Sequence, residues 1–318
     1  MVIPLCLHMD GWRFEMQIPQ LSGILTALAT PYDDSGRLDL KALDKLVEFL
    51  ISNGVHAIIP GGSTGEYYSQ TLEERKAVLA RVAEIVRGRI PLYVGANSMR
   101  PEETIEVTKY AEGLGYGAQL LAAPPYSLPG KSELIEHFRN IAKSTSLPII
   151  LYNFPARTGV DMDKEFLEGV LDIKKIFAIK ESSGSISRYY QHMVLYPELQ
   201  RVCGFDDQVL DQFLWGTRSW IAGASNFLPA EHVALYIACV EKEDFLLGRK
   251  LMKAMMPLIY LLENGGKFNQ YVKYGASLAG FPIGDVRAPL IGLSDAERSK
   301  FRKLYEELKS QNIASWVN

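Results

Sequence analysis

Short apolar runs alternate with amphipathic segments along most of this chain, and this alternation constrains the fold more than any other feature. Eight runs of strand length follow one another from Gly23 onward: 24–28, 57–60, 92–95, 120–123, 149–152, 176–179, 199–202 and 220–222. The segments between them carry apolar residues at helical spacing, as in the stripe Leu43, Leu46, Val47 and Leu50. Strands that alternate with helices in this way are joined by right-handed crossovers and form a parallel sheet.

Eight strand–helix units are enough to close a barrel. We therefore predict an α/β protein in which residues 23–226 form a (β/α)8 TIM barrel. An open, doubly wound parallel sheet is the alternative, because it also alternates strands with helices. Helix starts are marked by a predicted capping box at Thr71 and Glu74, and by Pro101 at an early helical position where its missing N–H costs nothing.

The strand pattern stops after Asn226. Three helical segments follow, at 228–264, 269–278 and 294–308. We therefore predict a C-terminal helical extension over residues 227–318. Residues 1–22 have no clear period, and we expect them to form an irregular N-terminal arm.

The composition excludes several classes of protein. A net charge of -3 and a pI near 6.0 disfavour nucleic acid or an anionic membrane as a partner, and no apolar segment has the length of a membrane span. Cys6, Cys203 and Cys239 are far apart and lack metal-ligand spacing, which fits a reducing cytoplasm. The five histidines are scattered as well, so we expect neither a bound metal nor a cofactor.

Lys180 is the residue that most strongly suggests chemistry. It closes the apolar run 176–179, and an unbroken run of this kind is typical of a strand buried on both faces, where lysine is rare. Burial disfavours the ammonium form of a lysine, and the neutral amine can attack a carbonyl carbon to form a Schiff base. The alternative is a lysine whose ammonium reaches water and pairs with Glu181.

Two further segments would meet Lys180 at one end of a barrel, because active sites lie in the loops that follow the strands. The second strand leads into residues 61–66, a glycine-rich turn whose amides and hydroxyls suit a small carboxylate. The fifth strand ends at Tyr152, a candidate proton relay, and Arg157 on the next loop suits another carboxylate. A flexible loop, a buried tyrosine and a surface arginine are the purely structural explanations of the same residues.

Together these motifs resemble those of the N-acetylneuraminate lyase / dihydrodipicolinate synthase family of class I, Schiff-base aldolases. Residues 62–66 are similar to the family's pyruvate-carboxylate loop, and Tyr152-Asn153-x-Pro155 with Lys180 is similar to its tyrosine and Schiff-base lysine. The resemblance runs from about Gly23 to the C-terminal helices. It implies a barrel with a helical extension, a small 2-oxo acid such as pyruvate as substrate, and a homotetramer or homodimer.

The resemblance also implies the catalytic roles. Lys180 would form the Schiff base with pyruvate or another 2-oxo acid, and the iminium would then permit bond cleavage, bond formation or elimination. Tyr152 would shuttle the proton, aided by Thr64 and by Tyr126, which in the family enters from the neighbouring subunit.

Four residues would bind substrate by the same resemblance. Ser63 and Thr64 would hold the pyruvate carboxylate, and Ile221 would line the pyruvate site. Arg157 resembles the arginine with which dihydrodipicolinate synthases bind the carboxylate of the second substrate. We therefore predict a synthase-like enzyme of this family.

Other features leave the second substrate open. Pro124-Pro125-Tyr126 replaces the Pro-Tyr-Tyr of synthases, and Tyr67 and Tyr68 are bulky where synthases often have small residues. A 2-keto-3-deoxy sugar-acid aldolase or dehydratase, or a hydroxyproline-pathway deaminase of the same family, is therefore the alternative. Arg218 and Trp220 either reshape the distal pocket or pack against the C-terminal helices.

The sequence supports functions from other classes of protein less well. A nicotinamide oxidoreductase needs a phosphate-binding turn after a strand, but the glycine-rich segment 113–117 follows a predicted helix and is expected to be a helix stop. A metal-dependent aldolase needs clustered ligands, which the histidines do not provide. A non-catalytic sugar-acid-binding barrel is disfavoured because both Lys180 and Tyr152 are present.

Overall fold

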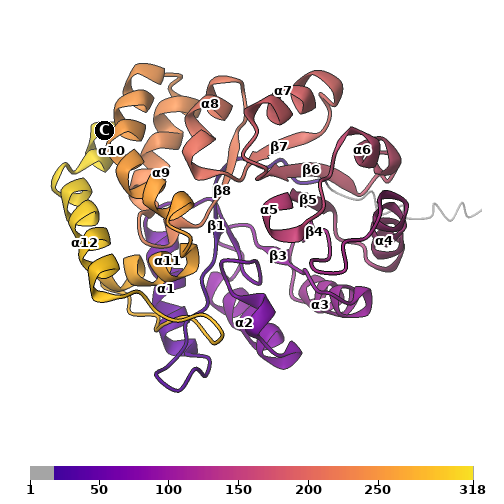
Figure 1. Ribbon diagram of the computed structural model, residues 1–318, viewed down its shortest axis with the longest axis horizontal. Helices are drawn as coiled ribbons and strands as arrows, with labels where there is room; N and C mark the ends of the chain where they lie inside the picture. Colours follow the sequence, from indigo (N-terminus) through magenta and orange to yellow (C-terminus); the bar gives the residue numbers. More distant parts are fainter. Residues whose placement is uncertain (1–17, 318) are drawn as a thin grey trace, which may run out of the picture.

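The structure is a computed structural model that describes residues 18–317, and its centre is a ring of eight parallel strands (Figure 1). The strands are β1 Gly23–Ala27, β2 Ala57–Ile59, β3 Tyr93–Gly95, β4 Ala118–Ala122, β5 Ile149–Asn153, β6 Ile176–Glu181, β7 Gln200–Cys203 and β8 Ser219–Ala222. They pair in the order β2-β1-β8-β7-β6-β5-β4-β3, and a parallel bridge between Ile58 and Leu92 joins the two ends. The predicted TIM barrel is confirmed, and the open sheet is wrong.

Helices on the outside of the ring connect successive strands. They are α1 Leu40–Ser52, α2 Leu72–Val86, α3 Pro101–Gly113, α4 Lys131–Ser144, α5 Pro155–Thr158, α6 Lys164–Val170, α7 Ile186–Leu195 and α8 Val209–Leu214, with 3-10 turns η1 Tyr67–Ser69, η2 Asp206–Gln208 and η3 Ala224–Asn226. The stripe predicted for α1 is its buried face. The capping box of Thr71 and Glu74 and the position of Pro101 at the start of α3 are confirmed, as is the end of α3 at Gly113.

Each strand sends alternate side chains into two separate apolar layers, because the side-chain period of a strand is two. On β5, Ile150 and Tyr152 point into the barrel, whereas Ile149 and Leu151 pack against the helices. Ala178 of β6 belongs to the inner row. Lys180 is two residues further along and continues that row to the carboxyl end of the strand.

The C-terminal extension lies against one side of the barrel, near α1 and α8 (Figure 1, orange to yellow). It contains α9 Pro229–Tyr236, the π-turn η4 Ile237–Glu241, α10 Phe245–Asn264, α11 Phe268–Leu278, α12 Asp295–Ser310 and the 3-10 turn η5 Ile313–Val317. The prediction of one continuous helix over 228–264 is wrong. Glu243 has a left-handed backbone with φ of 54°, and Asp244 caps a new helix by accepting from the N–H of Leu247. The predicted cap of the last helix at Ser294 is confirmed.

Residues 1–17, which hold most of the predicted N-terminal arm and Cys6, lie outside the described residues, and 18–22 form no helix or strand. Cys203 and Cys239 are buried free thiols. No helix within residues 18–317 is long and apolar enough to cross a membrane.

Candidate active site

Lys180 ends in the barrel interior beside Tyr152. The two residues are register partners on β6 and β5, and the Lys180 Nζ lies 4.2 Å from the centroid of the Tyr152 ring. Lys180 is only 6% exposed, and no carboxylate of the described residues lies within ion-pair distance of it. The face of the Tyr152 ring offsets part of the hydration that a buried ammonium loses.

The predicted alternative, an ion pair between Lys180 and Glu181, is wrong. Successive side chains of a strand point to opposite faces, so Glu181 lies outside the barrel. Its carboxylate accepts from the N–H of Ser183 at 2.7 Å and from the amide of Asn153 at 3.2 Å. Burial raises the pKa of Glu181, and these hydrogen bonds oppose the rise.

Gly204 makes room for the Lys180 side chain. A Cβ at this position, just beyond the end of β7, would lie 2.6 Å from the Cε of Lys180 and 2.2 Å from the Oγ of Ser182. No side chain fits at such distances without moving the lysine. The absence of a side chain at residue 204 is therefore a requirement of the site.

The glycine-rich loop after β2 lies at the same end of the barrel. Gly61 and Gly95 face each other so closely that a Cβ on Gly61 would lie 2.6 Å from the carbonyl oxygen of Gly95. Thr64 is 7% exposed, and its Oγ1 would lie 3.5 Å from a Cβ on Gly223, the residue that follows β8. The loop is thus folded over the mouth of the barrel, with Thr64 turned toward the end of β8.

Three other predicted site residues differ in how deeply they are buried. Ile221 is 1% exposed and belongs to the inner layer of the barrel. Arg157 is exposed on α5, with its guanidinium carbon 5.9 Å from the ring centroid of Phe154. Tyr126 is 88% exposed and has a left-handed backbone with φ of 70°. Within one chain, Tyr126 is the predicted catalytic residue that the structure does not bring to Lys180.

Trp220 packs away from the mouth, and this corrects one of the two explanations offered for its bulk. β8 begins at Ser219, so Arg218 lies at the opposite end of the barrel from Lys180. The indole of Trp220 is fully buried in the outer layer and stacks on His232 of α9 at 4.4 Å. Trp220 therefore packs against the C-terminal extension, Arg218 is exposed, and neither residue reshapes the pocket.

A buried ion pair that the sequence did not reveal holds the glycine-rich loop in place. Glu66, the last residue of the loop, is 0% exposed and has a left-handed backbone with φ of 57°. Its Oε1 lies 2.8 Å from the Nζ of Lys273 on α11, and its Oε2 accepts from the N–H of Arg287 at 3.0 Å. The loop is thereby fastened to the C-terminal extension.

The first turn of α11 also reaches the mouth of the barrel. Phe268 packs on Gly223 so closely that a Cβ there would lie 2.6 Å from the ring. The amide of Asn269 donates to the carbonyl oxygen of Ser63 and to the hydroxyl of Tyr68, both at 3.0 Å. No sequence signal identified these residues, because helical periodicity does not say which loop a distant helix end will touch.

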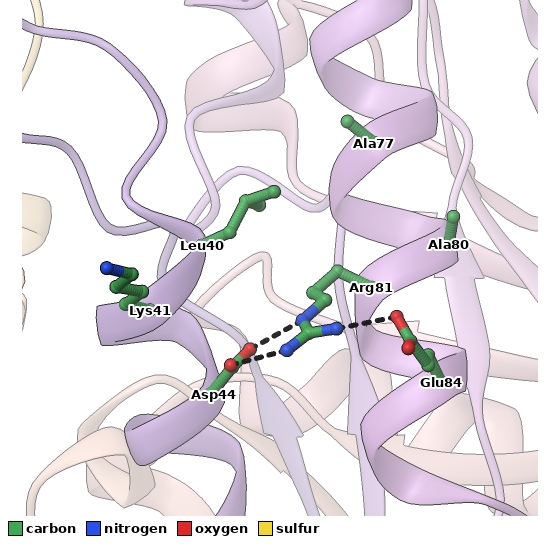
Figure 2. Close-up of a pocket in the computed structure, with 7 residues that line it drawn as sticks. All are labelled: Leu40, Lys41, Asp44, Ala77, Ala80, Arg81 and Glu84. Carbon is green, nitrogen blue, oxygen red and sulfur yellow. Dashed lines mark hydrogen bonds and ion pairs between the residues drawn. The ribbon is translucent and has the colours of Figure 1, made fainter.

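The hollow drawn in Figure 2 lies elsewhere, on the outer surface between α1 and α2. The guanidinium of Arg81 bonds Asp44 through two contacts of 2.7 and 2.6 Å and Glu84 through one of 2.6 Å. None of the predicted site residues lines this hollow. Because its only guanidinium is already bound to two carboxylates, we assign no substrate to it.

A parallel (β/α)8 barrel with a buried lysine and tyrosine at the carboxyl ends of two adjacent strands has the layout of a barrel enzyme. Comparison with known proteins gives the family. The model of the dihydrodipicolinate synthetase family matches residues 20–308, and the chain belongs to that family. It is therefore a lyase of the class I aldolase type.

Two sequence relatives and two solved structures illustrate the similarity. The 4-hydroxy-tetrahydrodipicolinate synthase of Alkaliphilus oremlandii is 34% identical over 92% of this chain and 99% of its own length. That of Exiguobacterium sibiricum is 35% identical over 86% and 93%. The synthase structure from Methylacidiphilum fumariolicum SolV has a TM-score of 0.88, with 32% identity over 94% of this chain and 99% of that one. A synthase from Acinetobacter baumannii complexed with pyruvate has a TM-score of 0.85, with 29% identity over 91% and 99%.

Proposed function

We propose that this chain forms a Schiff base between Lys180 and pyruvate or a closely related 2-oxo acid. The observation that carries the proposal is a buried lysine above a tyrosine ring, with no carboxylate of the described residues in ion-pair distance and with Gly204 making space for it. The pyruvate complex of the Acinetobacter baumannii relative supports pyruvate as the first substrate.

In the proposed reaction the neutral amine of Lys180 attacks the C2 carbonyl. A C–N bond forms, one proton from the amine and one from the phenol of Tyr152 convert the carbonyl oxygen to water, and the nitrogen keeps one positive charge as an iminium. The iminium withdraws electrons from C3, which can then lose a proton to give an enamine. The centroid of the Tyr152 ring lies 4.2 Å from this nitrogen, and its hydroxyl is the group we assign to the proton transfers.

The loop after β2 is our proposed binding site for the substrate carboxylate. Thr64 contributes a buried hydroxyl and Ser63 a half-buried one, while Asn269 fixes the loop through the Ser63 carbonyl. Ile221 forms an apolar wall inside the barrel. Arg157 is exposed at the rim, where its guanidinium is available to the carboxylate of a second substrate.

We further propose a homotetramer or homodimer in the cytoplasm. Tyr126 supports the assembly, because a tyrosine that is 88% exposed on a left-handed backbone is more easily explained by a neighbouring subunit than by solvent. In the assembly Tyr126 would enter the site of the neighbour. The buried free thiols of Cys203 and Cys239 support a reducing compartment.

For the second substrate we propose an aldehyde that carries a carboxylate, as in a synthase-like reaction. A hydroxylated substrate of the sugar-acid or hydroxyproline type is the second candidate. It is favoured by the phenol of Tyr68 and the amide of Asn269, two polar groups that bond each other, and by the charge of Arg157, which acts on Tyr68.

The intact mass of the protein after incubation with pyruvate and borohydride tests the proposal. We expect a reduced pyruvyl adduct that peptide mapping places on Lys180, and no adduct in Lys180→Ala. The matched control is Lys175→Ala, which removes a half-buried lysine just before β6 that bonds only backbone carbonyls. A folded wild-type protein without an adduct would refute Schiff-base chemistry and favour a non-catalytic binding barrel.

A further inference from the structure

Two acidic residues, one from the barrel and one from the extension, contact each other near Lys180. Asp206 opens η2 after β7 and is 2% exposed, and Glu263 lies half-buried near the end of α10. The N–H of Asp206 donates to the Oε1 of Glu263 at 3.1 Å, and the indole N–H of Trp220 donates to the Oδ1 of Asp206 at 2.7 Å. The second oxygen of Asp206, Oδ2, is buried and has no hydrogen-bond partner in the structure.

The pair lies close to Lys180. Gly204, two residues before Asp206, touches the Lys180 side chain, since a Cβ there would lie 2.6 Å from its Cε. The positive charge of Lys180 lowers the pKa of both carboxyl groups, although their burial has the larger, opposite effect. Electrostatic coupling is reciprocal, so a negative charge on either carboxyl group favours the charged form of Lys180.

Further acidic groups lie around the pair, on η2 itself and on two more elements, α8 and β7. The charge of Asp207 on η2 acts on both carboxyl groups, and that of Asp211 on α8 acts on Asp207. Burial raises the pKa of the Cys203 thiol on β7, which keeps this thiol neutral. Lys180 is the cation that acts on both carboxyl groups. A buried carboxyl pair next to further acids does not readily hold two negative charges.

We propose that Asp206 and Glu263 share one proton at neutral pH and together act as the counter-charge of Lys180, so that they set the pH range in which its amine is free. They are positioning residues that act through the lysine, and this inference rests on the proposed Schiff-base function. The unpartnered Oδ2 of Asp206 is the acceptor that a shared proton would use. The pair then carries one negative charge, which matches the single positive charge of an ammonium or an iminium.

Raising the pH should strengthen this counter-charge. Burial raises the pKa of both Asp206 and Glu263, and neighbouring carboxyl groups lose their protons one after the other. In alkaline solution the pair gains its second negative charge. That charge favours the ammonium of Lys180 over the free amine. The rate at which Lys180 attacks pyruvate should therefore rise less with pH than it would if the pair carried only one negative charge.

Glu263→Gln tests the pair, because it cannot form the second charge. The protein is mixed with pyruvate at pH values from 6 to 9.5, quenched at intervals into excess borohydride, and the rate of adduct formation is measured by intact mass. We expect equal rates for the variant and the wild type below pH 7, and a variant faster by about threefold to tenfold at pH 9. A variant that is faster only in alkali is a result that damage to the fold does not produce.

Asp206→Asn provides an independent second variant. It also leaves at most one negative charge, and the asparagine oxygen can still accept from Trp220, so we expect the same alkaline gain. Glu231→Gln is the matched control: it removes a carboxyl group that is 3% exposed and paired with Lys309, away from Lys180. Its rate relative to the wild type should not depend on pH.

The outcomes separate this inference from the function on which it rests. A ratio of variant to wild-type rates that stays constant from pH 6 to 9.5, or an alkaline loss of rate, would overturn the counter-charge and leave the Schiff base in place. A wild-type protein that forms no adduct at any pH would refute the proposed function, and the inference with it.

Discussion

Two buried lysines in this molecule each lie over a tyrosine ring, but they differ in whether an ion pair and a hydrogen bond hold their ammonium group. Lys180 lies in the barrel, 4.2 Å from the ring centroid of Tyr152, and Lys273 lies in the extension, 4.1 Å from that of Tyr32. Lys273 also forms an ion pair with Glu66 at 2.8 Å and donates to the carbonyl oxygen of Asp285 at 2.8 Å. Lys180 has neither contact among the described residues. An ammonium held by fixed partners is a structural group, whereas the Lys180 amine is not held by an ion pair or a hydrogen bond from residues 18–317 and is positioned to react.

Loss of Lys180 should have the largest effect on activity. In Lys180→Ala we expect exchange of the C3 protons of pyruvate with D2O, followed by NMR, to fall by about 10⁴-fold or more, because no amine remains to form the enamine. The thermal unfolding midpoint should be preserved. Exchange at the wild-type rate would show that the two lysines do not differ in the way described.

Loss of Lys273 should have the largest effect on stability. Lys273→Met leaves Glu66 charged, buried and without its cation, and we expect the free energy of unfolding in urea to fall by about 3–5 kcal/mol. Lys267→Met removes a more exposed lysine that pairs with Glu297, and should cost at most about 1 kcal/mol. Equal losses in the two variants would mean that Lys273 and Glu66 are not a structural pair. Glu66→Gln combined with Lys273→Met should restore part of the loss.

The two tyrosines beneath the lysines sharpen the comparison further. Tyr152→Phe removes the proposed proton relay, and we expect the rate of C3 exchange to fall by about 10²-fold. Tyr32→Phe is the matched control, since its hydroxyl accepts only from Gln70 among the side-chain hydrogen bonds of the described residues, and exchange should continue. If the two substitutions slow exchange equally, the phenol of Tyr152 has no special role.

His232 shows a third way of burying a base, which is to leave it uncharged. It is fully buried, its Nδ1 bonds the carbonyl oxygen of Leu228, and burial lowers its pKa to about 4. The unfolded chain takes up a proton near pH 6.5, so this contribution to stability is present above pH 6.5 and is lost as the pH falls toward 4, by up to about 1.4 kcal/mol per pH unit. Urea unfolding at pH 7, 6 and 5 should therefore show a shallower loss in His232→Phe. Identical slopes would mean that His232 is not neutral in the folded protein.

The sequence predicted the site residues whose position follows from the order of the strands. It missed those whose position follows from contacts between distant parts of the chain. Lys180 and Tyr152 were predicted to share one end of a barrel because parallel strands place all their carboxyl ends together. Glu66 and Lys273 are separated by most of the chain, and no local pattern indicates that they meet. The same is true of Asp206 and Glu263.

Two errors have local physical causes. The break between α9 and α10 falls at Glu243 and Asp244, where no glycine or proline marks a turn, so apolar periodicity alone predicted a continuous helix. Trp220 was considered for the pocket because the sequence predicted its strand but not the face of the strand on which its side chain lies. A shift of one residue sends a side chain to the other face of a strand.

The ion pair between Glu66 and Lys273 also determines the order in which parts of the site can form during synthesis of the chain. A chain emerging from the ribosome tends to fold from its N-terminus, and all eight strands with Lys180 are complete by Ala222. The loop after β2 must wait for α11 before Glu66 meets its cation and Asn269 reaches Ser63. The nascent barrel would therefore contain its reactive amine before the loop after β2 is fixed, and substrate binding would begin only once α11 has been synthesised.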